Sequence, residues 1–251
     1  SVARQEKSEG FVMDRVGIHF NDFYKNNLPF TLTEAQKRVI KEIHADLKSG
    51  RQMNRLLQGD VGSGKTIVAL LSSLIAIDNG FQACIMAPTE ILATQHYTGI
   101  ARLTEGLGIN VRLLIGSTKK KDRDRIHSML ESGELDIIIG THALIEDKVK
   151  FRNLGFVIID EQHRFGVQQR QALAGKGAGV NVLQMTATPI PRTLAITAFG
   201  EMDTSILSEI PRGRQPIKTS WVREQEMEQI FNFVERQIQE GRQAYMISPL
   251  I

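Results

Sequence analysis

The chain has 251 residues, of which 41% are hydrophobic and 24% are charged, and its formal net charge is +3. This composition is that of a folded globular protein with one large domain or two modest ones. The single cysteine excludes an internal disulfide and a zinc site built on cysteines, and the slight basic excess permits a polyanionic partner without requiring one.

No targeting or membrane-spanning segment is expected. The N-terminal residues are charged and lack the apolar core of a signal peptide. The longest apolar run, residues 67–77, is too short to span a bilayer and contains Ser72 and Ser73. We therefore expect a cytoplasmic protein. Because the chain begins at Ser1 and stops after a strand-like segment, we also expect a fragment of something longer.

The first helix is expected shortly after residue 30. Residues 1–29 mix polar and aromatic side chains and are expected to be a linker from a preceding part. Residues 31–36 carry a helix N-cap signal, and apolar residues then follow at helical spacing up to Gly50. Gln36 lies in the first turns, where its amide could match the donor and acceptor on a purine edge. A solvated helix glutamine is the more ordinary interpretation.

The segment GDVGSGKT at residues 59–66 matches the phosphate-binding pattern G-x-x-x-x-G-K-[ST] at every position. A short apolar strand at 55–58 precedes it, and an apolar helix at 67–78 follows. In such a loop, backbone N–H groups and the helix N-terminus form an anion site, which predicts a bound nucleoside triphosphate. Lys65 would reach the β and γ phosphates, and Thr66 would bind Mg²⁺. The other loop residues expected to bind the nucleotide are Gly59, Gly62, Ser63 and Gly64.

Downstream of this loop, strand-like and helix-like segments alternate, which is typical of an α/β fold with a mainly parallel sheet and helices on both faces. Ligands of such sheets gather at the carboxyl ends of the strands. The residues that follow each expected strand are therefore the candidates for function. The strands are expected at 81–87, 110–115, 136–140, 156–160 and 180–185.

Two adjacent carboxylates, Asp160 and Glu161, follow the apolar strand at 156–160. An aspartate at the tip of such a strand can hold Mg²⁺, while the neighbouring glutamate can orient and deprotonate the water that attacks the γ-phosphate. Lys65, Asp160 and Glu161 are therefore the expected catalytic residues. His163 has no partner at metal-ligand spacing and is expected to be a polar relay. Thr186 and Thr188, in the next loop, are expected to report the γ-phosphate to distant parts.

The remaining loops are rich in groups suited to a phosphodiester backbone, which such groups position without reading its sequence. Any one of them is more often an ordinary surface residue than a nucleic-acid contact. The cluster at residues 119–125 interleaves lysine and arginine with aspartate, so a solvated helix start is as good an interpretation as a nucleic-acid patch. The candidate DNA-binding residues are Thr89, Gln95, Ser117, Thr118, Thr141, His142 and Arg192.

Taken together, the motifs resemble the ordered series of the superfamily 2 helicases, in particular their bacterial ATP-dependent branch that acts on stalled replication forks. The resemblance covers roughly residues 25–251 and is carried by the segments 29–36 (PFTLTEAQ), 59–66 (GDVGSGKT), 87–96 (APTEILATQH), 140–144 (GTHAL), 160–170 (DEQHRFGVQQR) and 185–195 (MTATPIPRTLA). It implies a RecA-like P-loop NTPase domain that uses ATP and Mg²⁺, with Gln36 reading adenine and Phe30 beside it. It also implies that the DNA loops grip a branched duplex while ATP turnover drives translocation, in DNA repair and recombination.

The resemblance also divides the chain. Residues 1–29 would link to a missing N-terminal wedge, residues 30–212 would form the RecA-like ATP-binding domain, and residues 213–251 would begin a second RecA-like domain. In that last part we expect a strand at 216–222, a helix at 224–240 and a strand at 244–248. Because these cannot complete a sheet, we expect them to be poorly ordered, packed on the first domain or paired with another copy.

The family also uses an arginine from the second motor domain to stabilise charge on the transferring phosphate, a contribution of several powers of ten in rate. The motif that supplies it is missing from this chain, so we expect nucleotide binding, weak DNA binding, little hydrolysis and no unwinding by these residues alone. Three alternatives stay open: a translocase of the transcription-repair coupling type, a P-loop kinase, and a nucleotide-gated module without turnover. DNA polarity and oligomeric state are not predicted, although a monomer is expected for the full-length protein.

Overall fold

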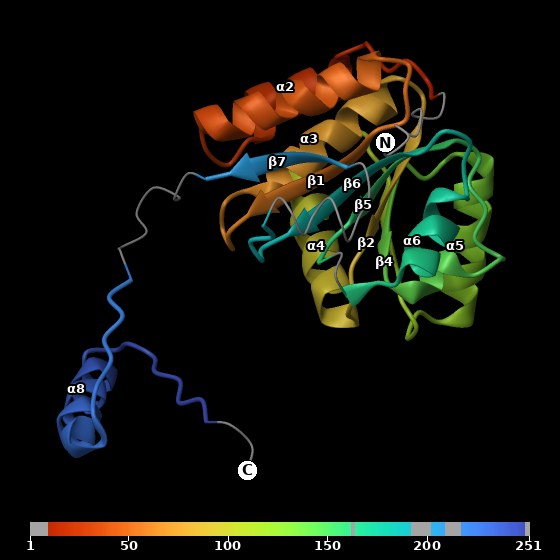
Figure 1. The fold of residues 1–251 in the computed structure, drawn as a ribbon. Coiled ribbons are helices and arrows are strands. Elements are labelled where there is room, and N and C mark those ends of the chain that lie inside the picture. The colour runs from red at the N-terminus through yellow and green to blue at the C-terminus, as the bar shows by residue number, and fades with distance from the viewer. Residues whose placement is uncertain (1–9, 162–163, 192–201, 209–216, 249–251) are drawn as a thin grey trace, which may run out of the picture. The chain divides into compact units, whose positions relative to one another are not determined.

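The computed structural model describes residues 10–161, 164–191, 202–208 and 217–248 (Figure 1). The chain divides into two compact units, Ser1–Pro211 and Arg212–Ile251. His163 and Arg192, which the sequence predicts to be functional, lie outside the described residues. Among the helices in the described ranges, none has the length and apolarity that crossing a membrane requires.

The first unit is built on a seven-stranded sheet whose order is β3-β4-β2-β5-β6-β1-β7. Each pair of neighbouring strands is parallel, which confirms the expected α/β architecture. β7 is an addition, because the sequence did not predict a strand there. The strands are β1 (Asn54–Gly59), β2 (Gln82–Met86), β3 (Val111–Leu114), β4 (Ile137–Gly140), β5 (Leu154–Ile159), β6 (Asn181–Thr186) and β7 (Asp203–Leu207).

Helices cover both faces of the sheet (Figure 1). Alternate residues of a strand point to opposite faces, so Ala83 and Ile85 of β2 belong to one core, and Cys84 and Met86 belong to the other. This two-sided burial explains why the strands read as continuous apolar runs. On the first face lie α1 (Ile18–Asp22), α2 (Glu34–Lys48), α3 (Lys65–Asp78) and α4 (Glu90–Leu103), and on the second lie α5 (Lys120–Ser132) and α6 (Val167–Ala174).

The segment before α2, for which the sequence suggested a linker, packs on the first unit. Met13 and Phe23 are fully buried in the core on the α2 and α3 face. Asp78, at the end of α3, accepts hydrogen bonds from the backbone N–H groups of His19 and Phe20 at 3.1 Å each. A short π-helical turn, η1 (Phe23–Asn27), continues the segment. Residues 10–28 therefore contribute to the core of this unit.

The expected helix after residue 30 begins where its capping signal placed it. Thr33 caps α2: its hydroxyl accepts from the Gln36 N–H at 3.2 Å, and the Gln36 side-chain oxygen accepts from the Thr33 N–H at 2.9 Å. This reciprocal capping box satisfies two backbone donors that a helix start otherwise leaves unpaired. It also fixes the orientation of the Gln36 side chain, which bears on the site below.

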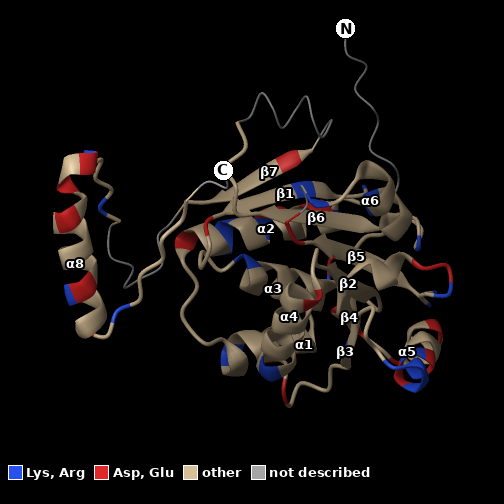
Figure 2. Ribbon diagram, turned by 90° about the horizontal axis from the view of Figure 1, so that it is seen from below, with Lys and Arg blue, Asp and Glu red and all other residues tan. Residues whose placement is uncertain are grey.

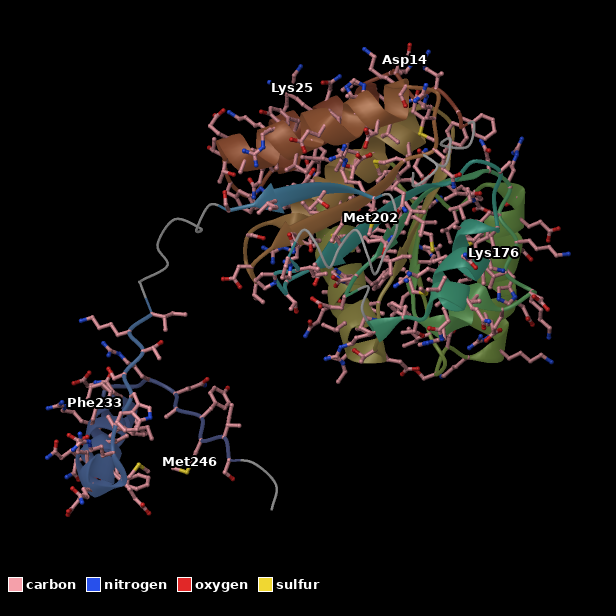
Figure 3. The ribbon with its side chains drawn as sticks, viewed as in Figure 1. Asp14, Lys25, Lys176, Met202, Phe233 and Met246 are labelled. Atoms are coloured by element: carbon pink, nitrogen blue, oxygen red, sulfur yellow. The ribbon has the colours of Figure 1, made fainter. Side chains whose placement is uncertain are left out.

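The second unit contains one long helix, α8 (Met227–Gln239), preceded by a short turn, η4 (Glu224–Glu226). The helix expected at 224–240 is thereby confirmed, whereas the strands expected at 216–222 and 244–248 are wrong: residues 217–222 and 244–248 are not strands. A strand exists only as part of a ladder, and residues 217–248 provide no partner for one. Phe233 and Met246 are exposed in this unit (Figure 3).

Candidate functional site

The strand order divides the carboxyl edge of the sheet into two halves. β5, β6 and β1 are neighbours and carry the residues expected to bind nucleotide. β3, β4 and β2 are neighbours on the other side and carry most of the residues expected to contact DNA. Because β2 pairs with β5, the two halves meet between these two strands. The loops expected to bind nucleotide and the loops expected to contact DNA therefore lie on separate halves of one sheet, and they are adjacent where β2 pairs with β5.

The phosphate loop is closed tightly around its glycines. Gly64, which precedes α3, has φ +85°, a conformation that favours glycine. A Cβ on Gly64 would lie 2.1 Å from the side-chain nitrogen of Gln36, which donates to the Ser63 carbonyl at 2.9 Å. Phe30 is half exposed beside the same glycine, and a Gly64 Cβ would touch the tip of its ring at 4.0 Å.

Gln36 therefore links α2 to the phosphate loop. Its side-chain oxygen is used in the capping box and its side-chain nitrogen in the bond to Ser63. To read a purine edge, as the sequence suggested, the amide would need to share or exchange these partners. What Gln36 does in this structure is hold the loop at a fixed distance from the start of α2.

Lys65 lies folded over its own loop. Its Nζ donates to the carbonyl oxygen of Gly59 and, at 3.1 Å, to that of Asp60. Burial lowers the pKa of Lys65 below its usual value, while the nearby carboxylates of Asp160, Glu161 and Asp60 oppose that shift. The ammonium is thus partly desolvated, so an incoming phosphate anion would compete with two carbonyls rather than with bulk water.

The loop also contains an unused polar atom. Among the described residues, the Ser63 hydroxyl is buried and has no hydrogen-bond partner. A Cβ added to Gly59 would overlap this hydroxyl, so the space beside it is kept free of side chains by the glycine. An orphaned hydroxyl, a partly desolvated ammonium and a glycine-lined loop at a helix N-terminus together fit a polyphosphate. Thr66 follows at the second position of α3 and is only partly exposed.

Asp160 and Glu161 follow β5 directly, beside the phosphate loop. Asp160 is buried, and its carboxylate accepts from the Glu161 N–H at 2.9 Å and from Nε2 of His96 at 2.6 Å. An ionised carboxylate can only accept, so Nε2 of His96 carries the proton. Glu161 has φ +48°, an unfavourable conformation for a residue with a side chain. This strained backbone turns the chain sharply just after the strand, at the position expected to be catalytic.

Of the residues expected to couple the site to distant parts, Thr186 and Thr188 lie within the described ranges. Thr186 is fully buried at the end of β6, and its hydroxyl accepts from the Thr188 N–H at 3.1 Å, which closes a tight turn. Thr188 is exposed. Gln58 of β1 donates to the Ile190 carbonyl at 3.3 Å and so ties this turn to the strand before the phosphate loop.

On the other half of the edge, two of the expected DNA contacts, Thr89 and Thr118, serve local structure. The Thr89 hydroxyl caps α4 by accepting from the Leu92 N–H, and the Thr118 hydroxyl accepts from the Ile115 N–H at 3.0 Å. Thr141 is buried. Gln95 and His142 are exposed, and the His142 ring lies 5.5 Å from that of Phe165. His142 lies in the short helix η2 (His142–Ile145).

The charged cluster at 119–125 forms the start of α5, where Lys, Arg and Asp side chains alternate (Figure 2). Arg123 turns back to donate to the carbonyl oxygens of Ile115 and Gly116 and lies 3.4 Å from Glu146. At least this arginine therefore has a structural use in fixing the loop after β3. The remaining charges are compatible with both interpretations that the sequence left open.

Two residues of the site were not singled out from the sequence. His96 contacts Asp160, and the Glu90 carboxylate accepts from the N–H and the hydroxyl of Ser117, each at 3.1 Å. Both lie in the segment 87–96, whose motif was noted, but their partners are 64 and 27 residues away along the chain. Only the pairing of β2 with β5, and the proximity of the loops after β2 and β3, brings them together.

Comparison with known proteins agrees with this arrangement. The family model described as DEAD/DEAH box helicase matches residues 33–196. The protein "ATP-dependent DNA helicase RecG" of Bacillus subtilis (strain 168) is 52% identical over 249 residues, which cover 99% of this chain and 36% of that protein. Its namesake from Streptococcus pneumoniae serotype 4 is 53% identical over 227 residues, which cover 90% of this chain and 34% of that protein. The chain thus spans about a third of the length of these curated relatives.

Two solved structures show similar folds. The structure described as RecG bound to a three-way DNA junction has a TM-score of 0.85 and 43% identity, and the match covers 97% of this chain and 32% of that one. The helicase MrfA bound to DNA has a TM-score of 0.58 and 18% identity, and its match covers 81% of this chain and 31% of that one. The second likeness concerns the fold alone. The expected RecA-like fold and the resemblance to bacterial ATP-dependent DNA helicases are confirmed.

Proposed function

Because the chain belongs to the DEAD/DEAH box helicase family, we propose that it is the ATP-binding motor part of a DNA translocase that acts on branched duplex DNA. The observation that carries this proposal is that the Asp160–Glu161 pair lies close enough to the phosphate loop to act on the charge of Lys65. Burial and the three carboxylates around Lys65 both act on the same ammonium, so the two motifs share one electrostatic environment. ATP use follows from the family, and the residue roles below are part of the proposal.

The phosphates would lie on the loop, with the Ser63 hydroxyl and the N–H groups at the start of α3 as donors. Lys65 would leave its two carbonyls to contact the β and γ phosphates. Thr66 and Asp160 would hold Mg²⁺, which neutralises phosphate charge when it is bound. Phe30 and Gln36 lie beside the loop, where a base would extend from it.

Glu161 would orient the attacking water and accept its proton. Its backbone, held at φ +48°, turns the chain away from the direction of β5. The hydrogen bond from the Glu161 N–H to the Asp160 carboxylate fixes Glu161 relative to Asp160, the proposed Mg²⁺ ligand. The two acidic residues thus take different roles because one is buried and bonded to His96 while the other is only partly buried.

For the DNA, we propose contacts from the loops after β2, β3 and β4, where Gln95 and His142 are exposed. The likeness to a structure with a three-way junction supports a branched partner. With such a partner, the expected compartment is the cytoplasm. Hydrolysis by this chain alone is expected to be slow, because the family takes a charge-stabilising arginine from the second motor domain.

The first test is Mg·ATP binding and hydrolysis by this chain and by a longer protein that contains it, with and without branched DNA. Lys65→Ala should weaken nucleotide binding by at least about tenfold, which corresponds to roughly 1.4 kcal/mol. Glu161→Gln should leave binding within about threefold of the parent and lower hydrolysis in the longer protein by about a hundredfold or more.

Lys176→Ala is the matched control for Lys65→Ala. Lys176 also donates to two backbone carbonyls, and burial also lowers its pKa, but it lies beside α6 on the other face of the sheet (Figure 3). This variant should bind nucleotide like the parent. Fast hydrolysis that neither DNA nor Glu161→Gln affects would contradict the proposal. Binding without turnover in the longer protein would favour a nucleotide-gated module instead.

A further inference from the structure

A side-chain hydrogen bond between His96 and Asp160 crosses the boundary between the two halves of the carboxyl edge. His96 comes from α4, the helix that follows β2, and its Nε2 lies 2.6 Å from Oδ2 of Asp160, which follows β5. Only 14% of the His96 side chain and 12% of the Asp160 side chain are exposed. A short bond to a carboxylate with little solvent around it is stronger and more directional than a surface contact.

His96 lies near the middle of α4, and the N-terminus of the helix is bound to the proposed DNA side. Thr89 caps the helix, and Glu90 in its first turn accepts two hydrogen bonds from Ser117, in the loop that also contains Thr118. His96 lies six residues further along the same helix, a rise of about 9 Å. A helix transmits a displacement along its axis with little loss, so the Ser117 loop and the Asp160 carboxylate are mechanically connected through α4.

α4 is anchored by fewer buried side chains than α3 is, although Leu92, Tyr97 and Leu103 also pack against the core as partly buried residues. Of its fourteen residues, Ala93 and Ile100 are the buried ones, whereas α3, of equal length, is buried along most of its course. An element with few buried side chains shifts at lower cost than a central one. A displacement of about 1 Å would take His96 and Asp160 out of hydrogen-bonding distance.

We propose that His96 is a positioning residue that couples the DNA-contacting loops to the nucleotide site by holding or releasing the Asp160 carboxylate. The inference rests on the proposed function, because it takes the Asp160 side as the nucleotide site and the Ser117 loop as the DNA side. With α4 in the position seen here, the carboxylate is oriented by His96. When bound DNA shifts the Ser117 loop and α4 as one unit, His96 moves with the helix. The orientation of the Asp160 carboxylate then changes, and the affinity of the site for Mg·ATP changes with it.

The test is the coupling between two ligands of this chain: a branched DNA oligonucleotide, and a nonhydrolysable ATP analogue with Mg²⁺. The DNA affinity is measured with and without saturating nucleotide, and the ratio of the two affinities is the coupling factor. We expect a factor of about fivefold or more for the parent chain. His96→Ala should bring this factor to within about twofold of one. Because the factor compares two affinities of the same variant, a general weakening of binding cancels.

His96→Gln should restore part of the coupling, since a side-chain amide can donate to Asp160 in place of the imidazole. His44→Ala is the control. His44 lies on α2, and its ring Nε2 lies 3.1 Å from the backbone carbonyl of Asp14, which is in neither proposed binding site. This variant should keep the parent factor. Thermal unfolding of both His96 variants checks that they fold. If His96→Ala does not fold, the coupling factor of His96→Gln is used to test the inference.

The outcomes separate the two proposals. If the parent chain binds no nucleotide, the proposed function and this inference both fail. If the parent binds both ligands with a factor of one, or if His96→Ala keeps the parent factor, the coupling role of His96 is wrong and the nucleotide site stands. Loss of coupling in His96→Ala with recovery in His96→Gln supports the inference.

Discussion

At the scale of single residues, the phosphate loop depends on a close approach that no side chain permits. Gln36 reaches across to the Ser63 carbonyl, and its nitrogen occupies the space into which a Gly64 Cβ would project. The glycine is therefore needed twice, once for its φ of +85° and once for the contact with α2. These two requirements can be separated by experiment, because another glycine shares the first without the second.

Gly64→Ala should lower both stability and nucleotide binding. The left-handed conformation costs about 1–2 kcal/mol for alanine, and the new methyl group would displace Gln36 from Ser63. Gly80→Ala is the matched control, since Gly80 has the same φ of +85° and nothing within 4 Å of an added Cβ. Both variants should lose stability in urea unfolding, Gly64→Ala more than Gly80→Ala because it also displaces Gln36, but only Gly64→Ala should weaken binding of a fluorescent ATP analogue. Equal nucleotide affinity in the two variants would contradict this account.

Residue types and spacing were enough to predict the phosphate loop and the Asp160–Glu161 pair, because both motifs are local. The partners of these residues were not predictable in the same way. Asp160 is bonded to His96, and both the oxygen and the nitrogen of the Gln36 side-chain amide are hydrogen-bonded. These contacts depend on which elements lie side by side in the fold. Sequence gives no direct signal for a contact between a helix after β2 and the end of β5.

At the scale of elements, long apolar segments were predicted well and short polar ones were not. The six strands from β1 to β6 lie within a few residues of their expected positions, because burial on both faces makes each a continuous apolar run. β7 has the sequence DTSIL and forms an edge of the sheet, so it carries no such run. Conversely, residues 217–222 and 244–248 contain the β-branched and aromatic residues common in strands, but pairing decides whether such a segment forms one.

The other edge strand, β3, is joined to β4 by a partly buried acid, Asp136, whose charge can be tested. Oδ2 of Asp136 accepts from the Asn110 N–H at 2.8 Å, just before both strands begin. Burial raises the pKa of Asp136 above 3.8, and the bond from Asn110 and the charge of His19 oppose the shift. The folded state therefore holds this proton more tightly than the unfolded state. Stability should fall as the pH rises from 3.8 through the raised pKa, and the cost should be complete above it.

Asp136→Asn should remove that cost while keeping an oxygen that accepts from Asn110. Its urea midpoint should exceed that of the parent at pH 7, and the difference should shrink as the pH falls toward 3.8. Asp14→Asn, at an exposed residue on the α2 side (Figure 3), is the control and should show no such trend. A difference that does not vary with pH would mean that the partly desolvated charge of Asp136 is not the cause.

At the scale of the whole sheet, strand order puts the two sets of proposed binding residues at different halves of one edge. Most of the proposed nucleotide residues lie beyond β1, β5 and β6, and the proposed DNA residues beyond β2, β3 and β4. The sequence predicted the loops but not this division, because the order in which parallel strands pair is set by the crossover connections. The division implies that the two binding activities can be impaired separately.

The double variant Gln95→Ala with His142→Ala should weaken DNA binding by about five- to thirtyfold, since each exposed side chain would contribute roughly 0.5–1 kcal/mol through contacts with the backbone. Its affinity for Mg·ATP without DNA should equal that of the parent chain. Lys65→Ala should show the reverse pattern. The two affinities are measured by fluorescence anisotropy with labelled DNA and labelled nucleotide. A loss of nucleotide affinity in the double variant would show that the halves are not independent.

The position of β1 between β6 and β7 has a consequence for how the chain is made. β1 and the phosphate loop leave the ribosome before their two neighbours, which follow about 130 and 150 residues later. At synthesis rates of about 5–20 residues per second, the strand waits roughly 6 to 30 seconds for its partners. During that interval its apolar residues have no neighbouring strand to pair with. The segment proposed to bind nucleotide is therefore exposed in the nascent chain for that time, when a chaperone can protect it.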